Sequence, residues 1–131
     1  MKTHKISLSG LVVLCALMLS SFTTVDPNTL RSLNDVLQNS LYKTVLSIDD
    51  SGAVIRKDNN GNSFTFNVAD ISEIKYENDG FHNLIVIFKK GKVSKGTVGG
   101  KEVEGDLNVI SFENKADCDN AINLFKRIIQ R

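Results

Sequence analysis

The side chains that could carry out catalysis are few and scattered in this sequence. His82 is the only histidine after His4, and histidine is the side chain that most readily exchanges a proton near neutral pH. No serine or cysteine around it lies in a recognised nucleophile motif, so we interpret His82 as a surface residue. Glu102, Glu104 and Asp106 alternate along one segment and could place carboxylates on one face. Acid–base catalysis favours an enclosed site, which a glycine-rich segment does not predict, so we expect no catalytic residue.

Metal and thiol chemistry are also weakly indicated. The run Asp58 to Asn62 (DNNGN) suggests a calcium-binding loop, but an EF-hand places glycine at the sixth position and glutamate at the twelfth. Counted from Asp58, glycine is fourth and Ala69 is twelfth, so the run predicts a turn. Cys118 lies on the apolar stripe of a helical pattern, which favours a small buried hydrophobic residue over a nucleophile or a dimer bridge. We expect no metal and no cofactor.

Five lysines form the most pronounced charge pattern. No acidic residue occurs from Phe81 to Lys101, and the glycines between the lysines would let backbone N–H groups approach an anion. On one interpretation, the lysines protect an exposed edge strand against aggregation. On the other, they bind an anionic partner, which would be an acidic protein surface, a polysaccharide or lipid headgroups. The candidate partner patch is Lys89, Lys90, Lys92, Lys95 and Lys101.

The elements that must position these side chains begin and end with helices. Leu107 to Phe112 predicts a short strand, and Asn114 can cap a helix that follows it over about 115–130. Apolar residues recur there at helical spacing, so one face of this helix should cover a sheet. At the other end of the domain, Asp26-Pro27 is a helix-start signal. An apolar stripe after it predicts an amphipathic helix over about 27–40.

Between the two helices the apolar period changes to two, which is typical of strands. Turn signals at Asp49–Gly52, Asp58–Gly61 and Asn78–Gly80 separate these strands. Leu84 to Phe88 is apolar on both faces, which predicts the most buried strand of the sheet or one covered by a helix. The glycine-rich run from Gly91 to Asp106 predicts a frayed strand and a loose turn. The strands are expected at 41–48, 53–57, 63–68, 71–77, 84–88, 92–98 and 107–112.

The first 23 residues have the three-part pattern of a secretory signal peptide. Lys2 and Lys5 precede an apolar core, and small residues follow it, with cleavage expected after Ser21 or Thr23. The apolar run is shorter than the roughly 20 residues of a transmembrane helix, so no membrane span is predicted. Lipoprotein processing at Cys15 is disfavoured, because the residue before it is not small. We expect export to the periplasm or the extracellular space.

The remaining 24–131 form a single domain with little net charge. The whole chain of 131 residues carries a formal charge of +1, and removal of Lys2 and Lys5 brings it to −1. Such a balance gives no overall attraction to nucleic acid or to anionic lipid. After processing, one cysteine is left, so an intramolecular disulfide is excluded. Stability should therefore come from one hydrophobic core.

The layout resembles the pleckstrin-homology-like (PH-like) superfamily from Leu41 to Arg131. FTFNVADISEIKY (Phe64 to Tyr76) resembles the paired strands of that superfamily, and VISFENKADCDNAINLFKRII (Val109 to Ile129) resembles its last strand and capping helix. The resemblance implies an α+β, mostly β fold, in which a meander of six or seven antiparallel strands forms a partly open barrel closed by the C-terminal helix. It also implies a binding scaffold. The acidic loop at Asp49–Gly52 departs from the basic loop of phosphoinositide-binding members, so lipid binding is not carried over.

These observations predict a small exported binding module of bacterial type, without enzymatic activity, that engages a protein or envelope component. The lysine patch, and the groove between the C-terminal helix and the sheet, would contact the partner. The alternatives are a small secreted hydrolase or an enzyme inhibitor, and an envelope component that self-associates through its helices. The sequence leaves the partner and the oligomeric state open.

Overall fold

The computed structural model of the protein describes residues 25–130, so the predicted signal peptide lies outside the described part. An α+β fold with mostly antiparallel strands and a helix at each end confirms the expected fold class. Within residues 25–130 the helices are α2 (Pro27–Leu37) and α3 (Lys115–Ile129), and a 3-10 turn, η1, covers Val68–Asp70. The eight strands of this described part are β1 (Val45–Ile48), β2 (Ala53–Lys57), β3 (Ser63–Asn67), β4 (Ile71–Asn78), β5 (His82–Phe88), β6 (Ser94–Val98), β7 (Lys101–Gly105) and β8 (Leu107–Phe112).

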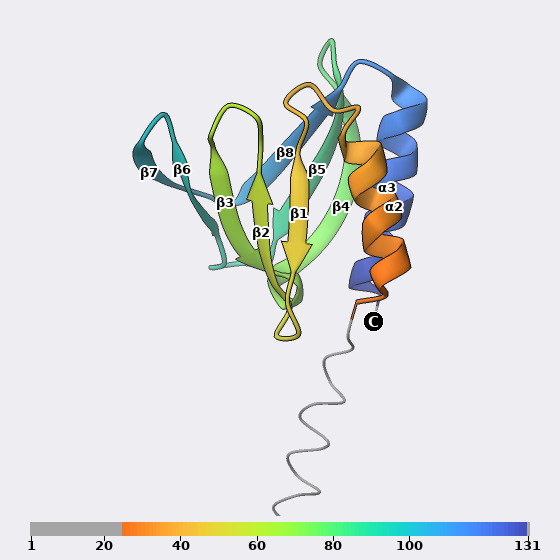
Figure 1. The fold of residues 1–131 in the computed structure, drawn as a ribbon. Helices are drawn as coiled ribbons and strands as arrows, with labels where there is room; N and C mark the ends of the chain where they lie inside the picture. The colour runs from red at the N-terminus through yellow and green to blue at the C-terminus, as the bar shows by residue number, and fades with distance from the viewer. Residues whose placement is uncertain (1–24, 131) are drawn as a thin grey trace, which may run out of the picture.

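The strands form two open sheets rather than one sequential meander. The larger sheet has the order β1-β2-β3-β6-β7, and the smaller has the order β4-β5-β8. After β5 the chain leaves the smaller sheet, adds the β6–β7 hairpin to the edge of β3, and returns to pair β8 with β5. Figure 1 shows the two sheets one behind the other, with both helices along one side. The β6–β7 hairpin therefore extends away from the helices.

The core lies between the two sheets and the helix pair. β5 is the most buried strand, as its apolar sequence predicts: Leu84, Val86 and Phe88 enter the core, and Ile85 on the opposite face is only 8% exposed. α3 covers the smaller sheet with the apolar stripe that the sequence indicates. Fully buried side chains come from all four parts, namely Leu33 and Leu37 of α2, Val54 of β2, Leu84 of β5, Phe112 of β8 and Phe125 of α3.

Both helices begin where their capping residues predict. The Asp26 side chain accepts a hydrogen bond from the Asn28 N–H at 3.1 Å, and the Asn114 side chain accepts one from the Ala116 N–H at 2.8 Å. Each bond satisfies a backbone donor that the first helical turn leaves free. α2 ends at Leu37, earlier than expected, because Ser40 turns to form a β-bridge with Phe112.

β7 is the strand that the sequence does not predict. Four of its five residues are exposed, and they point to both faces of the sheet. β7 therefore lacks the alternation of apolar and polar residues that predicts the other strands. It follows β6 through the two-residue turn Gly99-Gly100, where φ is 59° and 81°. Positive φ at both positions is typical of the type I′ hairpin turn, and glycine adopts it without strain. This turn makes β7 the outer strand of the larger sheet.

No helix within residues 25–130 is long and apolar enough to cross a membrane.

Candidate functional site

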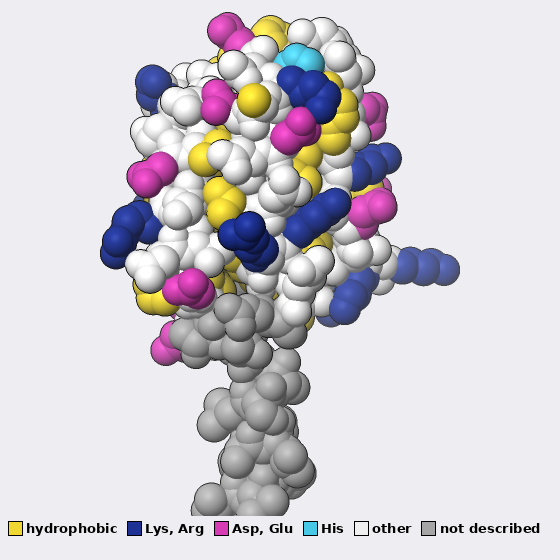
Figure 2. All heavy atoms as spheres, turned by 90° about the vertical axis from the view of Figure 1, so that its right-hand side faces the viewer, with side chains coloured by type: hydrophobic (Ala, Val, Ile, Leu, Met, Phe, Trp, Pro, Cys, Tyr) yellow, Lys and Arg dark blue, Asp and Glu magenta, His cyan; other side chains and the backbone are white. Residues whose placement is uncertain are grey.

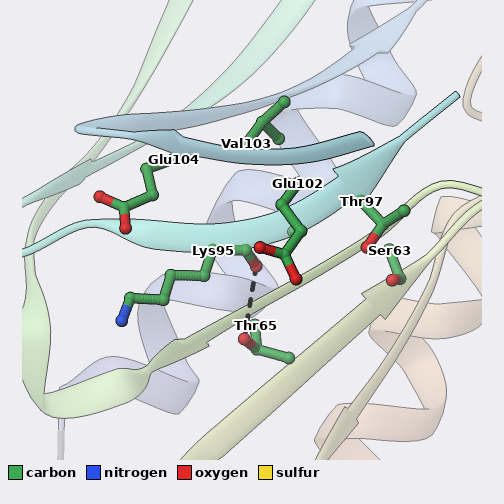
Figure 3. Close-up of a pocket in the computed structure, with 8 residues that line it drawn as sticks. Ser63, Thr65, Lys95, Thr97, Glu102, Val103 and Glu104 are labelled. Atoms are coloured by element: carbon green, nitrogen blue, oxygen red, sulfur yellow. Dashed lines mark hydrogen bonds between the residues drawn. The ribbon is translucent and has the colours of Figure 1, made fainter. Parts of the chain in front are cut away.

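An open groove lies on the outer face of the larger sheet, over β3, β6 and β7. Its volume is about 510 Å³, and Figure 3 shows the polar side chains that project into it from the three strands. The lining is mixed in charge and rich in hydroxyl groups. It consists of Ser63, Thr65, Lys95, Gly96, Thr97, Glu102, Val103 and Glu104.

Strand register arranges these side chains in two rows across the sheet. Thr65 lies opposite Lys95, and Lys95 lies opposite Glu104. The second row joins Ser63 to Thr97 and Thr97 to Glu102. Directly opposite residues in an antiparallel sheet point to the same face, so each row ends in a carboxylate on β7. The groove therefore has hydroxyl groups on its β3 side and two carboxylates on its β7 side.

Gly96 is the residue that lets β3 and β6 approach each other closely. A Cβ atom on Gly96 would lie 2.3 Å from the Ser63 carbonyl oxygen and 2.5 Å from Cδ1 of Phe64. Neither distance is possible for real atoms, so a side chain there would push Phe64 or the β3 backbone away. The hydrogen bond from the Thr65 hydroxyl to the Lys95 carbonyl oxygen, at 3.3 Å, also joins the two strands. Both features keep β3 and β6 close together beneath the groove.

The chemistry of this lining suits hydrogen bonding and charge pairing with a polar partner. Lys95, Glu102 and Glu104 are all exposed, so each can exchange water for a partner's groups at little desolvation cost. The carboxylates give the groove more negative than positive charge. No histidine or cysteine lines it.

The structure distributes the five lysines of the candidate patch over several places. Only Lys95 lines the groove. Lys89 and Lys90 lie in the turn between β5 and β6, and Lys92 lies 4.0 Å from an Asp70 carboxylate oxygen. Lys101 pairs with Val98 at the far end of the hairpin, which places it on the opposite face from Lys95. An anionic partner for this set stays a prediction.

His82 lies outside the groove and has a partner of its own. Its Nδ1 atom is 2.6 Å from the Tyr76 hydroxyl oxygen, and the two rings stack with centroids 5.8 Å apart. The Lys115 ammonium lies 4.9 Å from the centre of the Tyr76 ring and 2.7 Å from an Asp119 carboxylate oxygen. His82 is therefore not positioned to act on a molecule bound between Glu102 and Lys95.

The other candidate residues have structural surroundings. Cys118 is fully buried in α3, and this burial raises the pKa of its thiol to about 11. The Asp58 carboxylate accepts hydrogen bonds from the backbone N–H groups of Asn60 and Asn62, so the DNNGN run is a turn as expected. Among residues 25–130 no group of three or more potential metal ligands occurs.

A buried arginine is the feature that sequence reasoning missed. Arg56 is only 6% exposed, and no ion pair among the described residues includes it. Its Nη1 donates to the side-chain oxygen of Asn108, and its guanidinium lies 5.2 Å from the ring centre of Phe64. Its Nε has no partner in the described structure. Burial lowers the pKa of Arg56 to about 10.

A signal for Arg56 was present in the strand pattern. Val54 and Arg56 stand two residues apart in β2, and side chains with that spacing point to the same face. Because Val54 is fully buried, the alternation turns Arg56 inward, where it connects the larger sheet to β8 of the smaller one.

The helical side of the molecule carries no field of one sign. Figure 2 shows basic and acidic side chains interspersed over this face. Comparisons with family models, curated proteins and solved structures found no significant match to this chain.

Proposed function

We propose that the protein is an exported binding module without enzymatic activity, and that it takes a protein or envelope partner in the groove over β3, β6 and β7. The observation that carries the proposal is the groove itself, an open polar depression on the outer face of the larger sheet. Export rests on the signal-peptide pattern of residues 1–23. The PH-like resemblance is part of the same proposal, and the packing of α3 against an antiparallel sheet supports it.

The exposure of the groove favours binding over the hydrolase alternative. Glu102 and Glu104 are the only carboxylates in the lining, and both are exposed to solvent. Acid–base catalysis by a carboxylate depends on a shifted proton affinity, which burial and neighbouring charges provide. A binding surface needs no such shift, because exposed charges and hydroxyl groups are sufficient to select a partner.

A bulky residue in the groove tests this proposal. Thr65→Trp would fill the β3 side, whereas Ser47→Trp, on the same face but at β1, would leave the groove open. We expect envelope components captured by the wild-type protein to be retained by Ser47→Trp and lost by Thr65→Trp. The measurement is quantitative mass spectrometry of captured material, with circular dichroism to show that both variants fold. Equal capture by both variants, or no capture by the wild type, would contradict the proposal.

A further inference from the structure

The two edge strands of the larger sheet, β1 and β7, differ in how far the rest of the chain covers their outer edges. At β1, the side chain of Asn34 from α2 acts as a substitute strand: its Nδ2 donates to the Leu46 carbonyl at 2.9 Å, and its Oδ1 accepts from the Leu46 N–H at 2.8 Å. In the smaller sheet, the edge of β8 receives a hydrogen bond from the Leu41 N–H to the Ser111 carbonyl at 2.9 Å. These two edges are therefore partly covered.

The edge of β7 has no such cover in the described part of the chain. β7 pairs only with β6, and no described residue forms a hydrogen bond to its outer side. Residues that flank a two-residue turn form a hydrogen-bonded pair, and such pairs alternate along an antiparallel ladder. Lys101, Val103 and Gly105 therefore direct their backbone groups to β6. Glu102 and Glu104 direct their N–H and C=O groups outward.

The side chains of β7 define what a strand added at this edge would meet. On the groove face, the neighbours would be the carboxylates of Glu102 and Glu104. On the opposite face, the neighbours would be Val103, which is 37% exposed, and, at the turn end of the strand, Lys101. Cross-strand pairs of opposite charge and pairs of apolar residues both stabilise a sheet. The best complement is an extended segment that alternates basic and apolar residues.

A second copy of this chain is a poor occupant. When two copies pair their free β7 edges in antiparallel orientation, the groove faces of both sheets lie on the same side of the combined sheet. The registers that pair three or more residues of β7 then place Glu102 opposite Glu104, Glu102 opposite Glu102, or Glu104 opposite Glu104. Like charges directly opposite each other destabilise a sheet. The glutamates therefore disfavour self-pairing while they favour a basic strand.

We propose that β7 binds an extended segment of a partner protein by strand addition, and that the segment alternates basic and apolar side chains. The proposal rests on the proposed function, because it names the partner chemistry of the same groove. Main-chain hydrogen bonds to Glu102 and Glu104 supply part of the affinity, and the two carboxylates supply selectivity, which is how strand addition works at other free sheet edges.

Synthetic peptides test the mode of binding. The probe is a fluorescent peptide of alternating lysine and valine, titrated against the full protein by anisotropy at low and high salt. One control has the same residues with the backbone N-methylated at each lysine, the positions opposite Glu102 and Glu104, so that it keeps its charge but cannot extend the ladder. A second control alternates glutamate and valine. We expect binding of the first peptide, weakening with salt, and loss of binding for both controls.

Two variants of Glu104 separate hydrogen bonding from charge. Glu104→Pro removes an outward N–H from an edge strand, a position where proline is tolerated, and Glu104→Gln removes only the charge. Loss of one main-chain hydrogen bond weakens binding by about 5-fold, so we expect Glu104→Pro to bind at least that much more weakly than Glu104→Gln. In the wild type, peptide binding should slow hydrogen exchange at the Glu102 and Glu104 amides.

The possible outcomes distinguish this inference from the proposed function. Absence of binding by the lysine–valine peptide, or equal binding by its N-methylated form, would overturn strand addition. If Thr65→Trp still abolished capture of envelope components in that case, the groove would remain a binding site with another mode of recognition. Self-association that protects the Glu102 and Glu104 amides without peptide would instead identify a second copy as the occupant and overturn the inference.

Discussion

Arg56 is the only charged side chain buried among the described residues, and its environment gives a test of how the two sheets are joined. Its one side-chain hydrogen bond goes to Asn108 across the core, and its Nε is left without a partner. Desolvation of a buried charge lowers stability, and the attraction of Asp58 offsets only part of it, because the pKa of Arg56 stays below its usual value. We therefore infer that this cross-sheet contact costs stability rather than providing it.

Replacement of both partners should raise stability where replacement of one lowers it. Asn108→Leu alone would leave the guanidinium buried without its acceptor, and we expect a loss of about 1.5–3 kcal/mol in the free energy of unfolding. Arg56→Met with Asn108→Leu removes both polar groups at similar volume, and we expect a gain of about 1–3 kcal/mol over the wild type. Urea denaturation of the wild type and the three variants of this cycle measures both. A double variant no more stable than the wild type would contradict this account of Arg56.

Cys118 should make the stability of the protein depend on pH in the alkaline range. Burial raises the pKa of this thiol from 9.0 to about 11, so between these values the unfolded state releases a proton that the folded state keeps. Stability is then fully present below pH 9 and falls as the pH rises towards 11. At about 1.4 kcal/mol per pH unit, the loss is up to about 3 kcal/mol. Cys118→Ala should lack this loss.

The readout is the difference between the two unfolding curves at each pH. Contributions common to both proteins cancel in this difference, whereas the interaction of the Lys115 charge with the Cys118 thiol remains part of it. Parallel pH profiles for wild type and Cys118→Ala would show that the thiol is less protected than its burial indicates.

At the scale of the element, α2 protects the edge of β1. Asn34→Ala removes the two hydrogen bonds to Leu46 and leaves both backbone groups without a protein partner. We expect the free energy of unfolding to fall by about 1–3 kcal/mol, with faster hydrogen exchange at the Leu46 amide. Asp35→Ala, at the exposed neighbouring position, is the matched control and should change stability by less than about 0.5 kcal/mol. Equal effects of the two variants would mean that the edge contact is not stabilising.

The elements show which sequence signals were sufficient. Caps and apolar spacing predicted the starts of both helices, and the double-sided apolar run predicted β5. The end of α2 was missed because the Ser40 hydroxyl bonds to the Leu37 carbonyl at 2.6 Å, a local bond that competes with helical continuation. β7 was missed because the alternation of apolar and polar residues arises where one face of a strand is buried, and almost no side chain of β7 is buried.

At the scale of the whole molecule, the sheet order was not contained in any local pattern. The β6–β7 hairpin pairs with β3, about thirty residues upstream, as in the pair Thr65 and Lys95. Turn signals predict pairing only between strands that follow each other in the sequence. A meander, in which each strand pairs with the next, was therefore the expected order. The candidate groove depends on that non-local pairing, because β3 supplies one of its sides. The sequence could therefore place Glu102 and Glu104 on one face of a segment, but it could not bring them together with Lys95 and the β3 hydroxyl groups.

The arrangement of the two helices has a mechanical consequence. The start of α2 and the end of α3 lie together, since Asp26 and Thr29 line one small depression with Arg127 and Gln130, and both helices extend from there along the same side of the molecule (Figure 1). A pulling force applied between the two ends would separate the helices one turn at a time, instead of loading all their contacts at once. The helix pair should yield at low force, while the β6–β7 hairpin on the far side bears no load until the core opens.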